Sequence, residues 1–257
     1  MFGRRKRNYI ICASHRSGST LLCEGIRWTW RCGDPKEYLS PTRCVAMFEN
    51  GDVSTNPEKD YPGYVREIFE TKRMDNGVFG LKIMWKHLQR FPGKMDIPCA
   101  QRDHRRLARA LRTTFGPTRY IWSRREDKVK QAISFVKAKQ TGLFTHQQLE
   151  SITPDEAALE FDFDAVDELV QRFENEEKEW ETFFSINKIK PLTVTYEEFA
   201  PNYDSTIENA LRHIGVYEKG MEIPQPKRNK KLADNISKAW RQQYLDEKEK
   251  RAIQKSA

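Results

Sequence analysis

The stretch Ser14-His15-Arg16-Ser17-Gly18-Ser19-Thr20-Leu21-Leu22 follows directly on the apolar run Tyr9-Ile10-Ile11-Cys12-Ala13. An apolar strand, then a tight loop of small hydroxyl residues with one base, then an apolar helical pattern predict a strand–loop–helix unit. At the start of such a helix the backbone N–H groups point into the loop, and the helix dipole favours negative charge there. The stretch therefore predicts a loop that binds a phosphate-like anion.

This loop differs from the phosphate-binding loop of ATPases. The ATPase pattern GxxxxGK[ST] places its first glycine where this chain has Ala13 and Ser14, and a lysine after the second glycine, where this chain has Ser19. The cation of the loop, Arg16, comes before Gly18 instead. We therefore expect the loop to hold its anion in a manner different from that of an ATPase.

The chain has 257 residues, of which 38% are hydrophobic and 32% charged, and we expect a single polar globular domain over residues 1–257. No apolar run approaches the ~20 residues of a membrane span. The basic group at 4–7 precedes an apolar run shorter than the ~7–15 residues of a secretory signal. Five cysteines without a CxxC pair argue against a disulfide framework and against a zinc site. We expect a cytoplasmic protein that holds no metal.

The formal net charge of +8 indicates acidic partners without saying which. Short basic groups occur at 4–7, 102–106, 124–125 and 227–231, and such groups are usually solvated surface. A basic nucleic-acid-binding protein is an alternative, although the chain carries no zinc-finger pattern, RNP signature or basic heptad run. We expect no nucleic acid among the partners, and the sequence leaves a homodimer open.

Apolar strands alternate with helical patterns along the chain. Strands are expected near 8–13, 78–85, 119–122 and 191–196, and helices near 19–30, between Pro98 and Gly116, and near 127–140, 163–187 and 205–215. Gly51, Pro57 and Pro62 predict an irregular segment at about 40–62. The tail, about 223–257, predicts a basic lid followed by a last helix. The alternation predicts an α/β protein with a parallel sheet covered on both faces.

A short acidic segment, Gly33-Asp34-Pro35-Lys36-Glu37, follows the first predicted helix. A glutamate with an ordinary pKa near ~4.3 is ionised at neutral pH and can accept a proton, so Glu37 is a candidate general base. Taken alone, the segment is more typical of an ordinary turn with solvated acids.

A second basic cluster, Arg124-Arg125-Glu126-Asp127, follows the third predicted strand. Ligands of doubly wound sheets bind at the carboxyl ends of the strands, so this cluster should face the same crevice as the first loop. Arg125 and Ser134, with Gln131 on the same helix face as Ser134, could hold a second phosphate. The alternative is that Arg125 simply pairs with Asp127.

The third predicted strand does not end in the aspartate that binds magnesium in ATPases and P-loop kinases. Two phosphate sites without a metal carboxylate favour 3′-phosphoadenosine 5′-phosphosulfate (PAPS) over ATP. A P-loop small-molecule kinase remains the enzymatic alternative, and the missing Gly-Lys pair and aspartate oppose it.

Four segments together resemble the Stf0 sulfotransferase family. They are the loop at 14–22, Gly33-Asp34-Pro35-Lys36-Glu37-Tyr38, Gly80-Leu81-Lys82-Ile83-Met84-Trp85, and Arg125-Glu126-Asp127 with Gln131-Ala132-Ile133-Ser134-Phe135. The tail from Lys231 to Trp240 resembles the family's closing segment. The resemblance implies a P-loop-like three-layer fold with a central, mostly parallel sheet flanked by helices. It also implies transfer of a sulfuryl group from PAPS to a hydroxyl of a carbohydrate or glycolipid acceptor.

The resemblance further implies roles for individual residues. The 5′-phosphosulfate would be held by Arg16, Ser17, Gly18, Ser19 and Thr20, with Arg16 stabilising charge on the leaving group. Arg125 and Ser134 match the 3′-phosphate site, Lys231 matches a nucleotide contact that is often arginine in the family, and Glu37 matches the general base. The family's trehalose-sulfating enzyme has glutamine in place of His15 and glutamate in place of Asp34, and both positions touch the sugar. We therefore expect trehalose to be a poor acceptor here, with further acceptor contacts from the irregular segment at 40–62.

Overall fold

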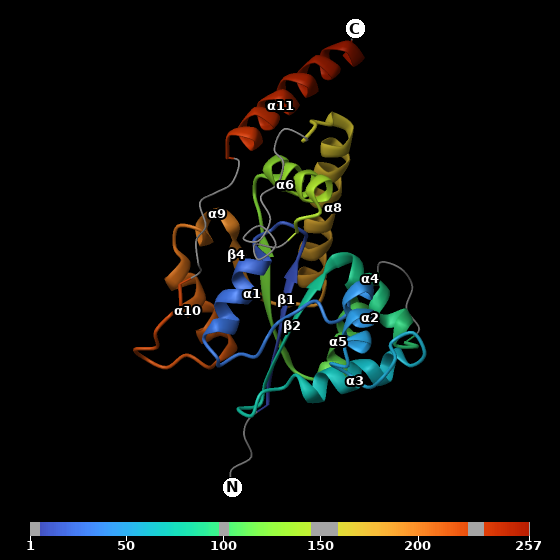
Figure 1. Ribbon diagram of the computed structural model, residues 1–257, viewed down its shortest axis with the longest axis vertical. Helices are drawn as coiled ribbons and strands as arrows, with labels where there is room; N and C mark the ends of the chain where they lie inside the picture. The colour runs from blue at the N-terminus through green and yellow to red at the C-terminus, as the bar shows by residue number, and fades with distance from the viewer. Residues whose placement is uncertain (1–5, 98–102, 145–158, 226–233, 257) are drawn as a thin grey trace.

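The computed structural model describes residues 6–97, 103–144, 159–225 and 234–256 (Figure 1). Its central sheet has four strands, all parallel, in the order β2-β1-β3-β4. The strands are β1 (Arg7–Ala13), β2 (Val78–Met84), β3 (Thr118–Arg124) and β4 (Leu192–Thr195). β1 therefore lies inside the sheet, and its carboxyl end, where the anion loop begins, has a neighbouring strand on each side.

Helices cover both faces of this sheet. One face is covered by α2 (Pro41–Glu49), α3 (Tyr61–Thr71), α4 (Trp85–Lys94), α5 (His104–Phe115) and the second half of α8 (Phe163–Ile186). The other face is covered by α1 (Ser19–Trp28), α9 (Tyr196–Phe199) and α10 (Tyr203–Ile214). The described residues thus form the three layers expected of an α/β protein, and the fold class predicted from the sequence is confirmed.

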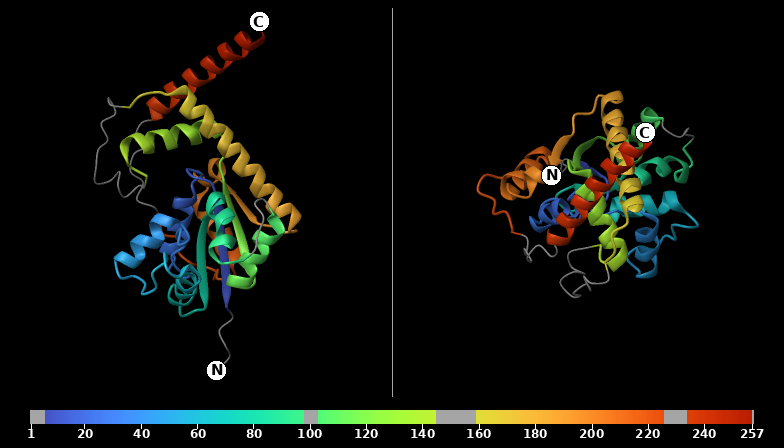
Figure 2. Two further views of the ribbon diagram at one scale, coloured as in Figure 1. Left: turned by 90° about the vertical axis from the view of Figure 1, so that its right-hand side faces the viewer. Right: turned by 90° about the horizontal axis from the view of Figure 1, so that it is seen from above.

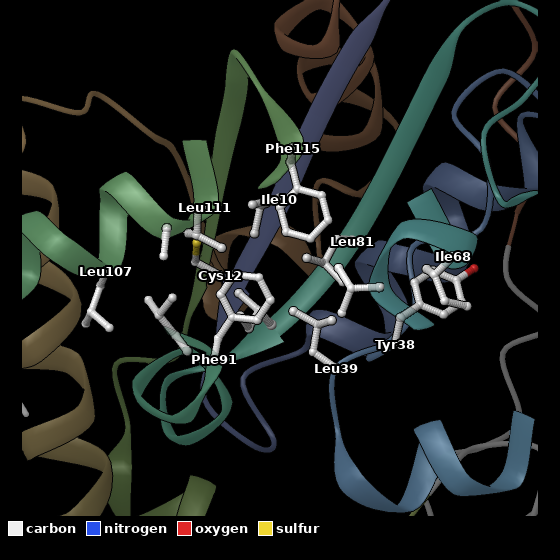
Figure 3. Close-up of a cluster of buried hydrophobic side chains, with 14 of the residues drawn as sticks. Ile10, Cys12, Tyr38, Leu39, Ile68, Leu81, Phe91, Leu107, Leu111 and Phe115 are labelled. Atoms are coloured by element: carbon white, nitrogen blue, oxygen red, sulfur yellow. The ribbon is translucent and has the colours of Figure 1, made fainter. Parts of the chain in front are cut away.

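Side chains of β1 alternate between the two faces of the sheet and thereby contribute to the hydrophobic core on each face. Ile10 and Cys12 point to the α5 face, where Ile10 lies among Leu81 and Phe115 (Figure 3), whereas Tyr9 and Ile11 point to the α1 face. Successive side chains of a strand leave opposite faces of the sheet, so a strand buried on both faces shows a continuous apolar run. All four side chains are at most 1% exposed.

A third, smaller core lies beyond the carboxyl ends of the strands. It joins α6 (Lys128–Thr141) and the first half of α8 to the last helix, α11 (Asp234–Ser256). Trp240 and Tyr244 of α11 are 6% and 1% exposed, as the amphipathic tail pattern predicts. Figures 1 and 2 show α11 at the end of the molecule opposite to the start of β1.

The segment expected to be irregular, 40–62, was predicted wrongly in part. It contains the whole of α2, and α3 begins inside it at Tyr61. Ser40 and Asp60 cap these helices by accepting hydrogen bonds from the backbone N–H groups of Arg43 and Gly63. Pro41 and Pro62 then occupy the first turns, where a proline starts a helix rather than breaking it.

Three smaller differences concern other elements. The first helix ends at Trp28 rather than at Trp30, and two short helices that the sequence did not predict, α4 and α9, follow β2 and β4 directly.

Lys231, the basic lid and Cys99 lie outside the described residues. The other cysteines, Cys12, Cys23, Cys32 and Cys44, are buried free thiols. Among the helices that the structure describes, none has both the length and the apolar character of a membrane span.

Candidate active site

The anion loop between β1 and α1 has two residues in the left-handed backbone region. They are Arg16, with φ 61°, and Gly18, with φ 87°. A Cβ at Gly18 would lie only 2.6 Å from Cδ2 of Tyr196, so only glycine fits beneath this ring. The sharp turn brings the chain into α1 with Ser19 as its first residue.

Two backbone carbonyls of the loop accept hydrogen bonds from side chains of neighbouring elements. Gln131 on α6 donates to the His15 carbonyl at 2.7 Å, and Ser123 on β3 donates to the Ser17 carbonyl at 3.2 Å. The Ser17 hydroxyl also lies 3.3 Å from that of Ser123, and both side chains are buried. Within the described residues no side chain caps the start of α1, which leaves its first-turn N–H groups available to an anion.

Arg16 and Ser134 meet on one side of the loop. Arg16 Nε donates to Ser134 Oγ at 2.9 Å, and Arg16 Nη1 donates to the Phe144 carbonyl at 2.7 Å. Burial, and then the nearby charge of Arg125, lower the pKa of Arg16. The arrangement places two guanidinium groups and a hydroxyl together, as in a site for a dianion.

Arg125 is held by residues that follow β4 rather than by Asp127. Its guanidinium carbon lies 4.7 Å from the centre of the Tyr196 ring, and its Nε lies 3.8 Å from Oε1 of Glu197. Glu197 also accepts from the backbone N–H groups of Glu126 and Asp127. Asp127 caps α6 and pairs with Arg241, and among the described residues no direct ion pair joins it to Arg125. Burial lowers the pKa of Arg125, and the charges of Glu197 and Asp127 oppose that shift. Arg125 Nε is buried but makes no hydrogen bond within the described residues. A buried donor without a partner is consistent with an arginine that binds a ligand.

Glu37 lies on the other side of the loop, beside β2. The backbone of Lys36 forms a bridge with β2, with Lys82 N–H donating to the Lys36 carbonyl at 3.0 Å. Lys82 Nζ lies 3.1 Å from Glu37 Oε1 and 3.4 Å from Oγ1 of Thr20, in the first turn of α1. Burial alone would raise the pKa of Glu37, but the charge and hydrogen bond of Lys82 outweigh this effect and hold the pKa below the usual value of a glutamate. Glu37 is therefore a carboxylate at neutral pH, next to the start of α1.

Two histidines flank this carboxylate. His87 Nδ1 lies 3.9 Å from Glu37 Oε2, and His15 interacts electrostatically with the same group. Burial lowers the pKa of each histidine to about 4, so both rings are neutral near pH 7. Nδ1 of each ring is buried without a hydrogen-bond partner. The side chain of Asp34 is more exposed than that of Glu37, and it pairs with Lys36 at 2.5 Å and with Arg27 at 3.8 Å.

The structure thus brings most predicted site residues to the carboxyl edge of the sheet. The loop residues 15–20, Glu37, Arg125 and Ser134 all lie there, whereas Lys231 lies outside the described residues. Sequence reasoning missed the part played by Lys82, Tyr196 and Glu197. A lone charge in an otherwise apolar strand was a usable signal for Lys82, but nothing local marked the other two.

A hollow of about 670 Å³ lies at the opposite edge of the sheet, where β1 begins. It is lined by Arg7, Trp30, Arg31, Arg73, Met74, Asp75 and Asn76. Because ligands of open α/β sheets bind at the carboxyl ends of the strands, we assign the chemistry to the loop and not to this hollow.

Comparison with known proteins found similar sequences and a matching family. The chain is 27% identical over 269 residues to trehalose 2-sulfotransferase of Mycobacterium tuberculosis strain Erdman. The aligned region covers 95% of this chain and 96% of the relative. It is also 26% identical over 263 residues to trehalose 2-sulfotransferase of Mycolicibacterium smegmatis. That aligned region covers 92% of this chain and 93% of the relative. The pattern described as Stf0 sulphotransferase matches residues 8–247. The chain is therefore a transferase that belongs to the Stf0 sulfotransferase family.

Proposed function

We propose that the protein transfers the sulfuryl group of PAPS to a hydroxyl of a carbohydrate or glycolipid. One observation carries the proposal: a loop and helix start suited to an anion lie between a guanidinium–hydroxyl cluster on one side and a half-buried carboxylate on the other. The cluster is Arg16, Arg125 and Ser134, and the carboxylate is Glu37. PAPS needs both an anion cradle and a separate site for its 3′-phosphate, and the acceptor needs a base.

The residues fit the donor in two groups. Ser17, Gly18, Ser19 and Thr20 would hold the 5′-phosphosulfate through the loop and the start of α1. Arg125 and Ser134 would hold the 3′-phosphate, and the guanidinium of Arg16 lies on their side of the loop. Lys231 is proposed as a further nucleotide contact. PAPS supplies a sulfuryl group on a good leaving group, and no residue of the proposal requires a metal.

Glu37 would act as the general base. Its carboxylate accepts the proton of the acceptor hydroxyl as that oxygen forms a bond to sulfur, and the bond from sulfur to the 5′-phosphate oxygen breaks. The electron pair leaves with adenosine 3′,5′-bisphosphate, whose new charge the loop N–H groups and Arg16 would stabilise. Most of the rate enhancement would come from positioning and electrostatics, because the protein forms no covalent bond to the group transferred.

The acceptor side is proposed from Glu37, His15 and Asp34, with contacts from residues 40–62. The curated relatives act on trehalose by name, which supports a carbohydrate acceptor. We place the enzyme in the cytoplasm as one domain over residues 1–257, acting on saccharides or glycolipids and not on nucleic acid, and a homodimer stays open.

Calorimetry without added magnesium tests the donor assignment. Adenosine 3′,5′-bisphosphate should bind well, and AMP, which lacks the 3′-phosphate, should bind poorly. Equal binding of the two nucleotides, or an absolute need for magnesium, would contradict the assignment to PAPS.

A further inference from the structure

Lys82 is a buried cation on the central sheet. Its side chain is 9% exposed, and its strand position puts it on the α1 face, together with Val78 and Gly80. In β2, Val78–Met84, it is the one charged residue. A charge in such a place is expensive unless it is paired, so a purely structural β2 would be better served by an apolar side chain.

The two polar contacts of Lys82 join the base to the first turn of α1, which under the proposed function are the acceptor and the donor parts of the site. Its Nζ is 3.1 Å from Glu37 Oε1, on the acceptor side, and 3.4 Å from Thr20 Oγ1, on the donor side. An ammonium has three N–H donors, so one is left for a ligand after these two contacts.

Among the described residues, Arg16 contacts neither Glu37 nor the first turn of α1. Its guanidinium is committed to Ser134 Oγ and to the Phe144 carbonyl, on the side of Arg125. The loop also lacks the lysine that follows the second glycine in ATPases, because Ser19 stands there. Among the residues that the structure describes, Lys82 is the cation that contacts both the first turn of α1 and the base.

We propose that Lys82 is a further catalytic residue, which donates a hydrogen bond to a sulfonate oxygen of PAPS during transfer. The inference rests on the proposed function. As the acceptor oxygen bonds to sulfur, its proton goes to Glu37 and the electron pair of the broken sulfur–oxygen bond goes to the 5′-phosphate. Negative charge therefore leaves Glu37 and arrives on the leaving group. Lys82 lies between Glu37 and the leaving group and stays protonated throughout. It offsets the negative charge of Glu37 before transfer and that of the leaving group after it.

The test compares two ligands that differ by the sulfuryl group. In a Glu37→Gln background, which should not consume the donor, calorimetry measures the affinity for PAPS and for adenosine 3′,5′-bisphosphate. Adding Lys82→Met should weaken PAPS about tenfold or more, the size of one hydrogen bond to a charged group. The affinity for the bisphosphate, which lacks the sulfonate oxygens, should fall clearly less than the affinity for PAPS. Lys178→Met, at an exposed lysine of α8, is the matched control and should change neither affinity.

The outcomes separate this inference from the proposed function. If Glu37→Gln alone binds neither nucleotide, the proposed function fails and Lys82 has no donor to contact. If it binds both and Lys82→Met weakens them equally, or weakens neither, only the role of Lys82 is overturned. Should Lys82→Met fail to fold, Lys82→Arg decides, because it keeps the charge. A guanidinium places its donors differently from an ammonium, so this variant should weaken PAPS more than the bisphosphate, and an equal change in both affinities would contradict direct contact with the sulfonate.

Discussion

Arg16 and Ser134, 118 positions apart in the chain, are joined by a 2.9 Å hydrogen bond from Nε to Oγ. This contact ties the anion loop to α6 and turns the loop's own cation toward Arg125. The opposite side of the loop is then left to Lys82 and Glu37. The site is thereby divided into a part suited to a nucleotide phosphate and a part suited to proton transfer.

Removing Arg125 should weaken binding at the 3′-phosphate selectively. Arg125→Ala removes a charge-assisted contact, typically worth about 1.5–3 kcal/mol, so adenosine 3′,5′-bisphosphate should bind roughly 10- to 100-fold more weakly in calorimetry. AMP should be nearly unaffected. Arg212→Ala, at an exposed arginine that pairs with Glu208, is the control and should change neither. An equal loss for AMP and the bisphosphate would place Arg125 outside the 3′-phosphate site.

Replacing the base should cost turnover and not donor affinity. Glu37→Gln keeps the shape of the side chain but cannot accept the proton, so kcat should fall by about 10²–10⁴. The affinity for adenosine 3′,5′-bisphosphate should be kept, because Glu37 lies across the loop from Arg125 and Ser134. Near-full kcat in the variant would move the base elsewhere, and Asp34 would be tested next.

The acceptor should not be free trehalose. The resemblance implies that the trehalose-sulfating enzyme has glutamine and glutamate where this chain has His15 and Asp34, so the hydrogen bonds offered to the sugar would differ, and sugar hydroxyls left unpaired would weaken binding. We expect kcat/KM for trehalose to be at least about tenfold below that for a larger or differently linked glycan or glycolipid. His15→Gln with Asp34→Glu should raise the value for trehalose, and Asp34→Asn should mainly raise the acceptor KM. Efficient, saturable sulfation of trehalose by the unmodified enzyme would contradict this reading.

Much of the fold could be predicted from the sequence because its signals are local. The apolar runs at β1 and β3 and the helical spacing of α8 each report burial directly, and Gly18 with its neighbours marks the turn into α1. The helices α2 and α3 were missed because a proline has two opposite meanings, and Pro62 was interpreted as breaking a helix. Whether a proline starts or ends a helix depends on the cap beside it, here Ser40 and Asp60.

The site was predictable only as far as its residues lie in motifs. Glu37, Arg125 and Ser134 were found in this way. The partners of these residues come from distant segments: Lys82 reaches Glu37 from β2, and Glu197 reaches Arg125 from the helix after β4. The turn of Arg16 toward Ser134 was also not predictable, because it depends on the left-handed conformation of that residue and on the position of α6.

Acid should destabilise the fold before carboxylates are protonated. His15 and His87 have a pKa of about 4 in the folded protein, against 6.5 for a free side chain, because burial disfavours the charged ring. The unfolded chain therefore binds more protons between these values, and the free energy of unfolding falls as the pH drops below about 6.5. Thermal unfolding midpoints measured from pH 7.5 to 5 should decrease, and His87→Gln should make the decrease shallower. Midpoints that stay constant, or that fall equally in the variant, would contradict neutral buried rings.

The most direct test of the central claim is transfer of label. PAPS with a radioactive sulfuryl group is incubated with the protein and a panel of saccharides and glycolipids, without metal, and the products are separated from the donor. The account predicts label on at least one hydroxyl-bearing acceptor, stoichiometric release of adenosine 3′,5′-bisphosphate, and loss of both with Glu37→Gln. Absence of any labelled acceptor, together with transfer of the γ-phosphate of ATP to the same panel, would contradict it.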